Sequence, residues 1–272
     1  MEKYYTADPS TLIEESKISI QTYENPVDIW LEFAIEMIKE IENNNRIGKR
    51  TVLICPCGPV EQYRIFAKLV NSLKIDLKNT WIINMDEYID EDGCLMSEDD
   101  KFSFRKCMNE ELYANIDSDL IMPEEQRIFP NPQNLDYIPK LIEELGGVDI
   151  CFGGVALNGH IAFNEPQPEL TNEEFSRLSV RTVVLTPETR IKDAILSRGG
   201  AVDTVPKNAI TIGMKEILSA KRIFLSMMNQ MQRAVVRKAC LGSVSSDCPV
   251  SFLQTHSNAN LYVLNTVVEK PF

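Results

Sequence analysis

Short apolar runs alternate with helix-period segments along most of this chain. Apolar runs of four or five residues bounded by turn residues are typical of buried strands, and they fall at 51–55, 81–85, 148–152, 182–185, 209–212, 223–227 and 261–264. Apolar positions at helical spacing predict helices at 26–45, 60–73, 137–145, 191–196 and 231–239. The first helix should begin at Pro26, because Asn25 before it is a typical N-cap residue.

Strands that alternate with helices predict parallel pairing through right-handed crossovers. We therefore expect an α/β fold with a doubly wound, mostly parallel sheet and helices on both faces, similar to a Rossmann fold. The 272 residues contain no internal repeat and no long Pro/Gly/Ser linker. Their 44% hydrophobic content suits a sizeable core, so the sequence predicts one domain over residues 1–272.

The net charge of −12 argues against partners that carry phosphate backbones or anionic lipid surfaces. No apolar run is long enough to span a membrane, and the first five residues do not resemble a signal peptide. We therefore expect a cytoplasmic protein that binds neither nucleic acid nor membrane.

The seven cysteines are scattered, and Cys55 and Cys57 form the only close pair. An odd number in a long chain disfavours a disulfide framework. With two histidines and no second cysteine pair, the sequence also disfavours a zinc site. Reduced thiols, several of them buried, are the expectation.

Candidate catalytic residues follow two of the predicted strands. Strand 81–85 leads to Asp86, and strand 148–152 opens into a Gly-rich run. Ligands of open α/β sheets bind at the carboxyl ends of strands, and histidine and carboxylate side chains exchange protons near neutral pH. The alternatives are a structural turn with a bonded histidine, and carboxylates that cap a helix or lie in a surface turn. The residues of interest in the run are Gly153, Gly154, Asn158, His160 and Glu165.

Three segments resemble one enzyme family. Residues 159–166, Gly-His-Ile-Ala-Phe-Asn-Glu-Pro, resemble the signature of glucosamine-6-phosphate deaminases, also called isomerases. Residues 84–88, Asn-Met-Asp-Glu-Tyr, look like a second motif of that family, and residues 252–256 are similar to its Leu-Gln-Leu-His segment. The resemblance covers almost the whole chain, with the motifs in the expected order.

The resemblance implies an enzyme that converts a 2-amino-2-deoxy aldose, typically glucosamine or galactosamine 6-phosphate, to a ketose and ammonia. Asp86 would move a proton between C1 and C2, His160 would open the sugar ring, and Glu165 would orient the histidine. No metal or nucleotide cofactor is expected, the partner is a small-molecule sugar, and a homo-oligomer is possible by analogy. The expected substrate-binding residues are Cys57, Gly58, Gly153, Gly154 and Arg198.

The chain departs from the family pattern in its catalytic and phosphate-binding segments. Asn158 stands where the family has an aspartate, and an amide cannot carry the charge that stabilises an imidazolium. The first loop reads Pro-Cys-Gly-Pro-Val-Glu at 56–61, where the family has a Thr-Gly-Gly-Thr-like anion loop. Simple alignment places the family's two basic phosphate ligands on neutral residues, Ile195 and Gln232. Only nearby arginines could compensate for them: Arg64, Arg198 and Arg233.

These departures predict an altered phosphate site and leave other activities open. One is a non-catalytic or weakly active sugar sensor. Another is a 6-phosphogluconolactonase-like hydrolase, although that family carries Gly-His-Thr-Ala-Ser and residues 161–165 favour the deaminase branch. The acidic run at 86–100 predicts a solvated loop at the edge of the site, and the resemblance implies a lid near 171–179.

Overall fold

The computed structural model describes residues 2–272 and contains two sheets. In the larger sheet, seven parallel strands lie in the order β1-β10-β9-β6-β2-β3-β5. The strands of this sheet are β1 (Ser19–Tyr23), β2 (Thr51–Cys55), β3 (Thr80–Asn84), β5 (Arg127–Ile128), β6 (Ile150–Gly154), β9 (Arg222–Met227) and β10 (Ala259–Leu264). The expected doubly wound, mostly parallel α/β fold is confirmed.

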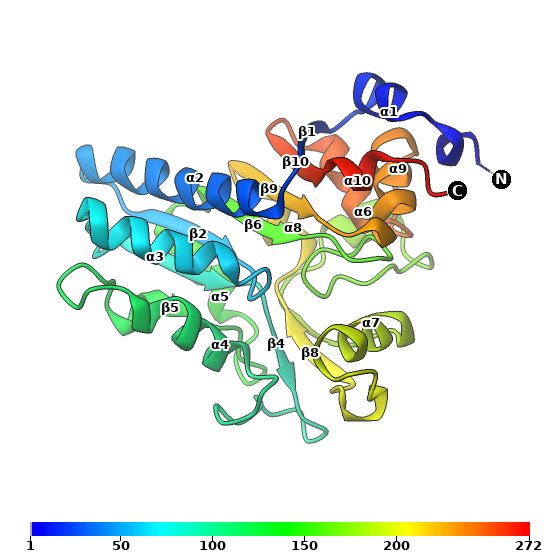
Figure 1. Cartoon of the computed structure of the whole chain (residues 1–272). Coiled ribbons are helices and arrows are strands. Elements are labelled where there is room, and N and C mark those ends of the chain that lie inside the picture. Colours follow the sequence, from blue (N-terminus) through cyan, green and yellow to red (C-terminus); the bar gives the residue numbers. More distant parts are fainter. Residues whose placement is uncertain (1) are drawn as a thin grey trace.

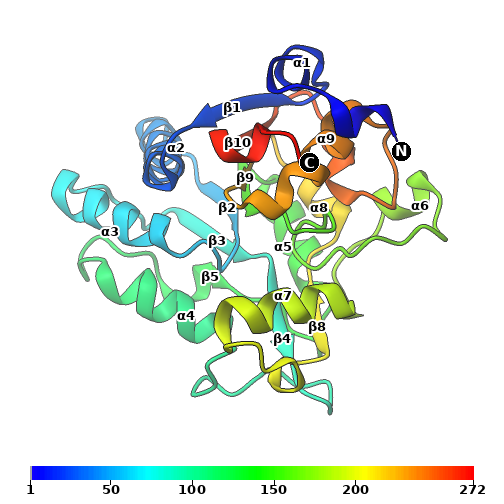
Figure 2. The ribbon, with the colours of Figure 1, turned by 45° about the vertical axis from the view of Figure 1, so that its right-hand side comes forward.

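Helices cover both faces of this sheet (Figures 1 and 2). Successive strand residues point to opposite faces, so Leu53 packs in one hydrophobic cluster with α2 and α3, and Ile54 packs in the other with α5, α8 and α9. These two clusters form the core on the two faces of the larger sheet, and a third, smaller cluster lies around Tyr88, Phe163 and Ala209. The helices involved are α2 (Pro26–Arg46), α3 (Glu61–Leu73), α5 (Tyr137–Leu145), α8 (Met214–Leu218) and α9 (Arg233–Leu241).

Helix α2 begins where the sequence predicts. Asn25 has extended backbone angles and Pro26 occupies the first turn, where its missing N–H breaks no helical hydrogen bond. Apolar residues then recur every three or four positions and face the sheet. The buried positions of this stripe are Ile29, Phe33, Ala34, Met37, Ile38 and Ile41.

The three-stranded sheet differs from the sequence prediction. Strands β7 (Arg181–Val184) and β8 (Asn208–Thr211) pair antiparallel with each other, and β8 pairs antiparallel with β4 (Asp86–Ile89). The expectation that 182–185 and 209–212 continue the parallel pattern is therefore wrong. Only Met85 separates β3 from β4, which leaves no room for a crossover helix, so β4 leaves the main sheet and needs partners elsewhere.

Part of the acidic run is likewise ordered and buried. Residues 86–89 form β4 and are all buried, whereas a solvated loop was expected for 86–100. Several short elements also lack a sequence prediction. They are α1 (Pro9–Glu15), α4 (Phe104–Glu111), α6 (Asn172–Ser176), α8 (Met214–Leu218), α10 (Asn265–Val268) and the strands β1 and β5.

Side chains of the C-terminal motif at 252–256 form hydrogen bonds with the backbone of neighbouring segments. His256 donates from Nε2 to the Ala220 carbonyl across 2.8 Å, and its Nδ1 accepts from the backbone N–H of Asn258. The Gln254 amide donates to the carbonyls of Ala239 and Gly242. None of residues 252–256 lines the cavity that contains Asp86. Within residues 2–272, no helix has the length and apolarity that crossing a membrane requires.

Candidate active site

The loop after β6 turns back sharply and places His160. The Ala156 N–H donates to the His160 carbonyl across 3.1 Å. Gly159 adopts φ of +89°, a backbone conformation that favours glycine. A Cβ there would also lie 3.1 Å from Val235. Gly159 thus allows the tight return that buries the imidazole against the end of the sheet.

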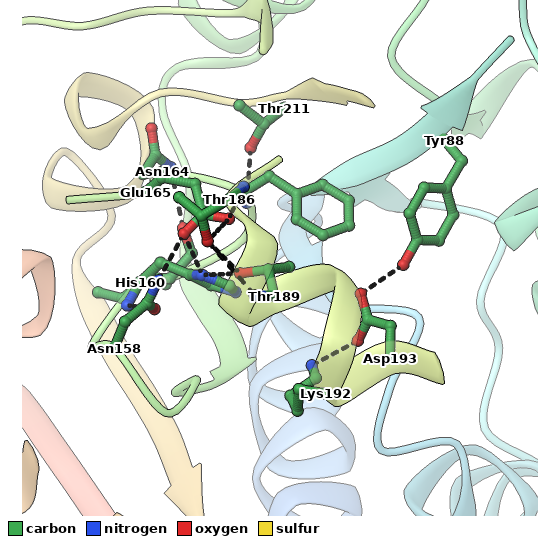
Figure 3. Close-up of polar contacts among 12 residues, drawn as sticks. Tyr88, Asn158, His160, Asn164, Glu165, Thr186, Thr189, Lys192, Asp193 and Thr211 are labelled. Atoms are coloured by element: carbon green, nitrogen blue, oxygen red, sulfur yellow. Dashed lines mark hydrogen bonds and ion pairs between the residues drawn. The ribbon is translucent and has the colours of Figure 1, made fainter. Parts of the chain in front are cut away.

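His160 is held by a carboxylate from the same loop (Figure 3). Its Nδ1 lies 2.9 Å from Oε2 of Glu165, and the Asn158 side-chain amide donates to the same oxygen across 2.7 Å. The hydroxyl of Thr189 lies 3.4 Å from Nδ1. The other carboxylate oxygen of Glu165 accepts from the backbone and hydroxyl of Thr186, each at 3.3 Å.

These contacts determine the charge of Glu165. Burial alone would raise its pKa, but the hydrogen bond and positive potential of His160, with further bonds from Thr189 and Asn158, lower the pKa to about 2. An ionised carboxylate only accepts hydrogen bonds, so Nδ1 of His160 must carry the hydrogen. In the neutral imidazole, Nε2 is then the acceptor, and none of the described residues forms a hydrogen bond with it.

Asp86 is the second group of the site and is the first residue of β4, separated from β3 by Met85. Burial raises its pKa to about 8, and the negative charges of Glu87 and Asp193 add to this effect, whereas Lys192 opposes it. Among the described residues, none donates a hydrogen bond to its carboxylate. Glu87 has a structural role instead, since its carboxylate accepts from the backbone N–H groups of Phe104 and Arg105 at the start of α4.

Asp86 and His160 line one cavity of about 440 Å³. Its walls bring together the first loop, β4, the loop after β6, the segment before α4, and α7 (Pro187–Ser197). Of the residues expected from the sequence, those that line it are Cys57, Gly58, Asp86, Gly154, His160 and Arg198. Asn158 and Glu165 lie behind the imidazole, and Gly153 lies beneath the cavity, where a Cβ would come within 2.8 Å of Leu225.

Helix α7 supplies site residues that the sequence alone did not identify. Thr186, Thr189 and Asp193 recur at three- and four-residue spacing and so share one helix face. Asp193 accepts from the Tyr88 hydroxyl across 2.7 Å and pairs with Lys192 at 2.7 Å (Figure 3). The helix therefore contacts both the His160 network and the strand that carries Asp86. Of these residues, the helix predicted at 191–196 included Lys192 and Asp193 but neither threonine.

Three cationic side chains line the cavity: Lys101, Lys192 and Arg198. The Arg198 guanidinium stacks over Phe102, with Cζ 3.8 Å from the ring centroid, a cation–π contact. Lys101 and Lys192 were not identified from the sequence.

The other two candidate arginines are occupied elsewhere. Arg64 pairs with Glu111 on α4, and Arg233 contacts the Thr266 carbonyl and Glu269. Neither lines the cavity. Of the three candidate arginines, Arg198 is therefore the one that the structure places at the cavity.

The first loop offers little to an anion. The Cys57 thiol is buried, and a hydrogen bond with the Cys107 thiol, with burial, holds the pKa of Cys57 well above its usual range, so it stays neutral. Pro59 has no N–H, and Glu61 lies exposed in the first turn of α3. Within residues 2–272, no group of three or more His, Cys, Asp or Glu side chains could hold a metal ion.

The chain was compared with known proteins. No protein-family model matches it. Glucosamine-6-phosphate deaminase 1 of Bacillus subtilis is 30% identical over 251 residues, which cover 89% of this chain and 94% of the relative. The glucosamine-6-phosphate deaminase of Colwellia psychrerythraea is 33% identical over 202 residues, which cover 72% of this chain and 70% of the relative.

Solved structures agree with these relatives. A monomeric glucosamine-6-phosphate deaminase superposes with a TM-score of 0.79 at 26% identity, covering 91% of this chain and 98% of that one. The 6-phosphogluconolactonase of Thermotoga maritima superposes with a TM-score of 0.63 at 12% identity, covering 90% and 98%. At that identity the second likeness shows a shared fold alone.

Proposed function

Because this chain belongs to the glucosamine-6-phosphate deaminase family, we propose that it converts a 2-amino-2-deoxy aldose to a ketose and ammonia. The observation that carries the proposal is one cavity lined by two groups suited to different steps. These are the unbonded carboxylate of Asp86 and the imidazole of His160, whose Nε2 is free.

His160 is proposed to open the ring. Its Nε2 takes the proton of the anomeric hydroxyl and returns a proton to the ring oxygen, which leaves C1 as an aldehyde. Glu165 stays ionised and fixes the tautomer through Nδ1. It also stabilises the imidazolium while that proton is held.

Asp86 is proposed to move the carbon-bound proton. It removes the proton from C2 while O1 takes a proton from water, which gives an enolamine, and it then delivers a proton to C1, which places a C=N bond at C2. Water adds to that carbon, ammonia leaves, and the ketose remains. The raised pKa of Asp86 suits a base that must also return the proton near neutral pH.

Asn158 does not remove the charge that His160 needs. Its amide donates to Glu165 while the carboxylate of Glu165 contacts the imidazole directly. The amide adds no charge of its own, however, and draws electron density from the shared oxygen. We therefore expect slower ring opening than with two carboxylates, rather than its loss.

The far end of the substrate is proposed to be recognised differently from the family pattern. The first loop lacks hydroxyl donors, and Gln232 and Ile195 are neutral. Each lost charge-assisted hydrogen bond is typically worth about 1.5–3 kcal/mol. We therefore propose weak affinity for a 6-phosphate, with Lys192 and Arg198 as its remaining cationic partners.

An ammonia-release assay on glucosamine, glucosamine 6-phosphate and galactosamine 6-phosphate tests the activity. We expect release from at least one of them and a loss of roughly 10²–10⁴-fold in Asp86→Asn. Binding without ammonia release would indicate the sensor alternative. Hydrolysis of 6-phosphogluconolactone would indicate the lactonase alternative. Unchanged activity in Asp86→Asn would remove Asp86 as the base.

A further inference from the structure

A second cavity of about 250 Å³ adjoins the first. The two cavities share the wall residues Gly154, Val155, Ala156, Lys192 and Leu196. The second cavity also touches Pro59 of the first loop, Gln232, and Leu196, the neighbour of Ile195. It thus lies where the resemblance places the phosphate of the family's substrates.

The walls of this second cavity are mainly apolar. The apolar residues that line it are Pro59, Val155, Leu157, Leu196, Met228 and Met231. Leu157 and Leu196 are 41% and 63% exposed, so apolar surface remains uncovered where the cavity meets solvent. Methionine side chains adapt their shape to different apolar groups.

Two buried polar side chains of this wall, Gln232 and Ser226, are bonded within the protein, whereas the third, Asn229, is exposed and accepts from the Met231 N–H through its side-chain oxygen. Gln232 donates to the Val155 carbonyl and accepts from the backbone N–H of Asn229 at 2.7 Å. The Ser226 hydroxyl donates to the Gly153 carbonyl at 3.4 Å. Gln232 is buried by these contacts, so it cannot turn toward a ligand without leaving buried groups unpaired.

Among residues 2–272, Lys192 is the one charged residue that lines the second cavity, and it is paired with Asp193 at 2.7 Å. A phosphate there would be desolvated against thioether and leucine side chains, with one shared cation for compensation. Such burial of a doubly charged group is unfavourable. A neutral group would lose little hydration and would cover the exposed leucines.

We propose that this second cavity binds a neutral, largely apolar substituent at the far end of an amino-sugar substrate, in place of a phosphate. The inference rests on the proposed function for the position of the sugar ring. It names the substrate class as amino sugars that carry an ether-, ester- or alkyl-type group at that end.

Calorimetric titration of the full chain with three ligands tests the proposal. They are glucosamine, glucosamine 6-phosphate and the 6-O-butyl ether of glucosamine, which is not hydrolysed. We expect the butyl ether to bind about tenfold or more tightly than glucosamine, as expected when several methylene groups are buried. Tighter binding of glucosamine 6-phosphate than of the ether, or equal binding of ether and glucosamine, would overturn the proposal.

A matched pair of variants locates the effect. Leu157→Asn should cancel the advantage of the butyl ether over glucosamine. Leu135→Asn, at a residue of similar exposure (37%) that lines neither cavity, should retain it. Equal behaviour of the two variants would place the butyl group elsewhere and contradict the proposal.

Methyl NMR of ¹³C-methionine-labelled protein provides a readout independent of affinity. The signals of Met228 and Met231 should move with the butyl ether and stay in place with glucosamine. Unmoved signals at saturating ether would overturn the proposal. Turnover of glucosamine 6-phosphate combined with that result would leave the deaminase function intact, whereas the failure of all three sugars to bind would overturn both.

Discussion

Asn158 and Glu165 are joined by a hydrogen bond of 2.7 Å, which ends on the same carboxylate oxygen that contacts His160. The amide thus occupies a place where the resemblance expects an aspartate. Here the carboxylate of Glu165 alone contacts His160, and the side chain that donates to this carboxylate is the neutral amide of Asn158. This arrangement avoids two like charges in a buried position and makes the charge of the site depend on Glu165.

Replacing Asn158 by aspartate should therefore destabilise the protein in a pH-dependent way. Two carboxylates at this separation cannot both stay ionised without strong repulsion. We expect Asn158→Asp to lower the melting temperature more at pH 7 than at pH 4.5, where the pair can share a proton. Thermal unfolding at the two pH values measures this. The control is Asn109→Asp, at an exposed position, and an equal shift at both pH values would contradict the account.

Asp86 should make the folded state less stable as the pH rises. Its pKa is about 8 in the folded protein against 3.8 ordinarily. Between these values the folded state holds a proton that the unfolded chain releases, so stability falls from about pH 4 to about pH 8.

Asp86→Asn removes this penalty. We expect it to stabilise the fold by on the order of 2 to 5 kcal/mol at pH 9 and by little at pH 4. Urea unfolding at both pH values measures the difference, with the exposed Asp203→Asn as a control. A variant that gains no stability at pH 9 would show that burial does not raise the pKa of Asp86.

Neighbouring charges should shift the pH dependence of activity in opposite directions. The negative charge of Asp193 raises the pKa of Asp86, and Lys192 lowers it. Since the base must be ionised to act, activity should rise with pH toward about 8. Asp193→Asn should move this rise to lower pH, and Lys192→Met should move it to higher pH. Profiles of kcat/KM against pH for the three proteins test the assignment, and shifts of the same sign would refute it.

Residual binding of a 6-phosphate should depend on α7 and the residue that follows it. Lys192→Met and Arg198→Met should weaken binding of glucosamine 6-phosphate relative to glucosamine, because both side chains line the cavity. Arg64→Met should have no such effect, since Arg64 pairs with Glu111 outside it. Calorimetry measures the ratio for each variant. Weaker binding of glucosamine 6-phosphate relative to glucosamine in Arg64→Met would mean that α3 supplies the anion site.

Local sequence patterns predicted much of the main sheet. The apolar run at 51–55 became β2 with the same bounds, and the Pro26 helix start was found where expected. Periodicity reports which face of an element is buried, and that information is local. It could not reveal that β4 leaves the main sheet to pair with β8.

The residues of the candidate site that lie in sequence motifs could be predicted. Asp86 and His160 were identified from the strand-end motifs, and the family membership that those motifs predicted is confirmed by the relatives. Lys192 and Asp193 were missed because only the packing of α7 beside Tyr88 brings them to the cavity. For the same reason, the sequence could not show which of Arg64, Arg198 and Arg233 lines the cavity.

The most direct test of the central claim is to follow the reaction in D₂O by NMR. If Asp86 carries a proton from C2 to C1, it can exchange that proton with solvent, so the ketose should carry deuterium at C1 and form in equal amount with ammonia. Asp86→Asn should abolish both the ketose and the label. Two results would contradict the account. One is ammonia release that Asp86→Asn does not reduce and that leaves C1 of the ketose without deuterium. The other is the absence of ketose from every amino sugar tested at saturating enzyme.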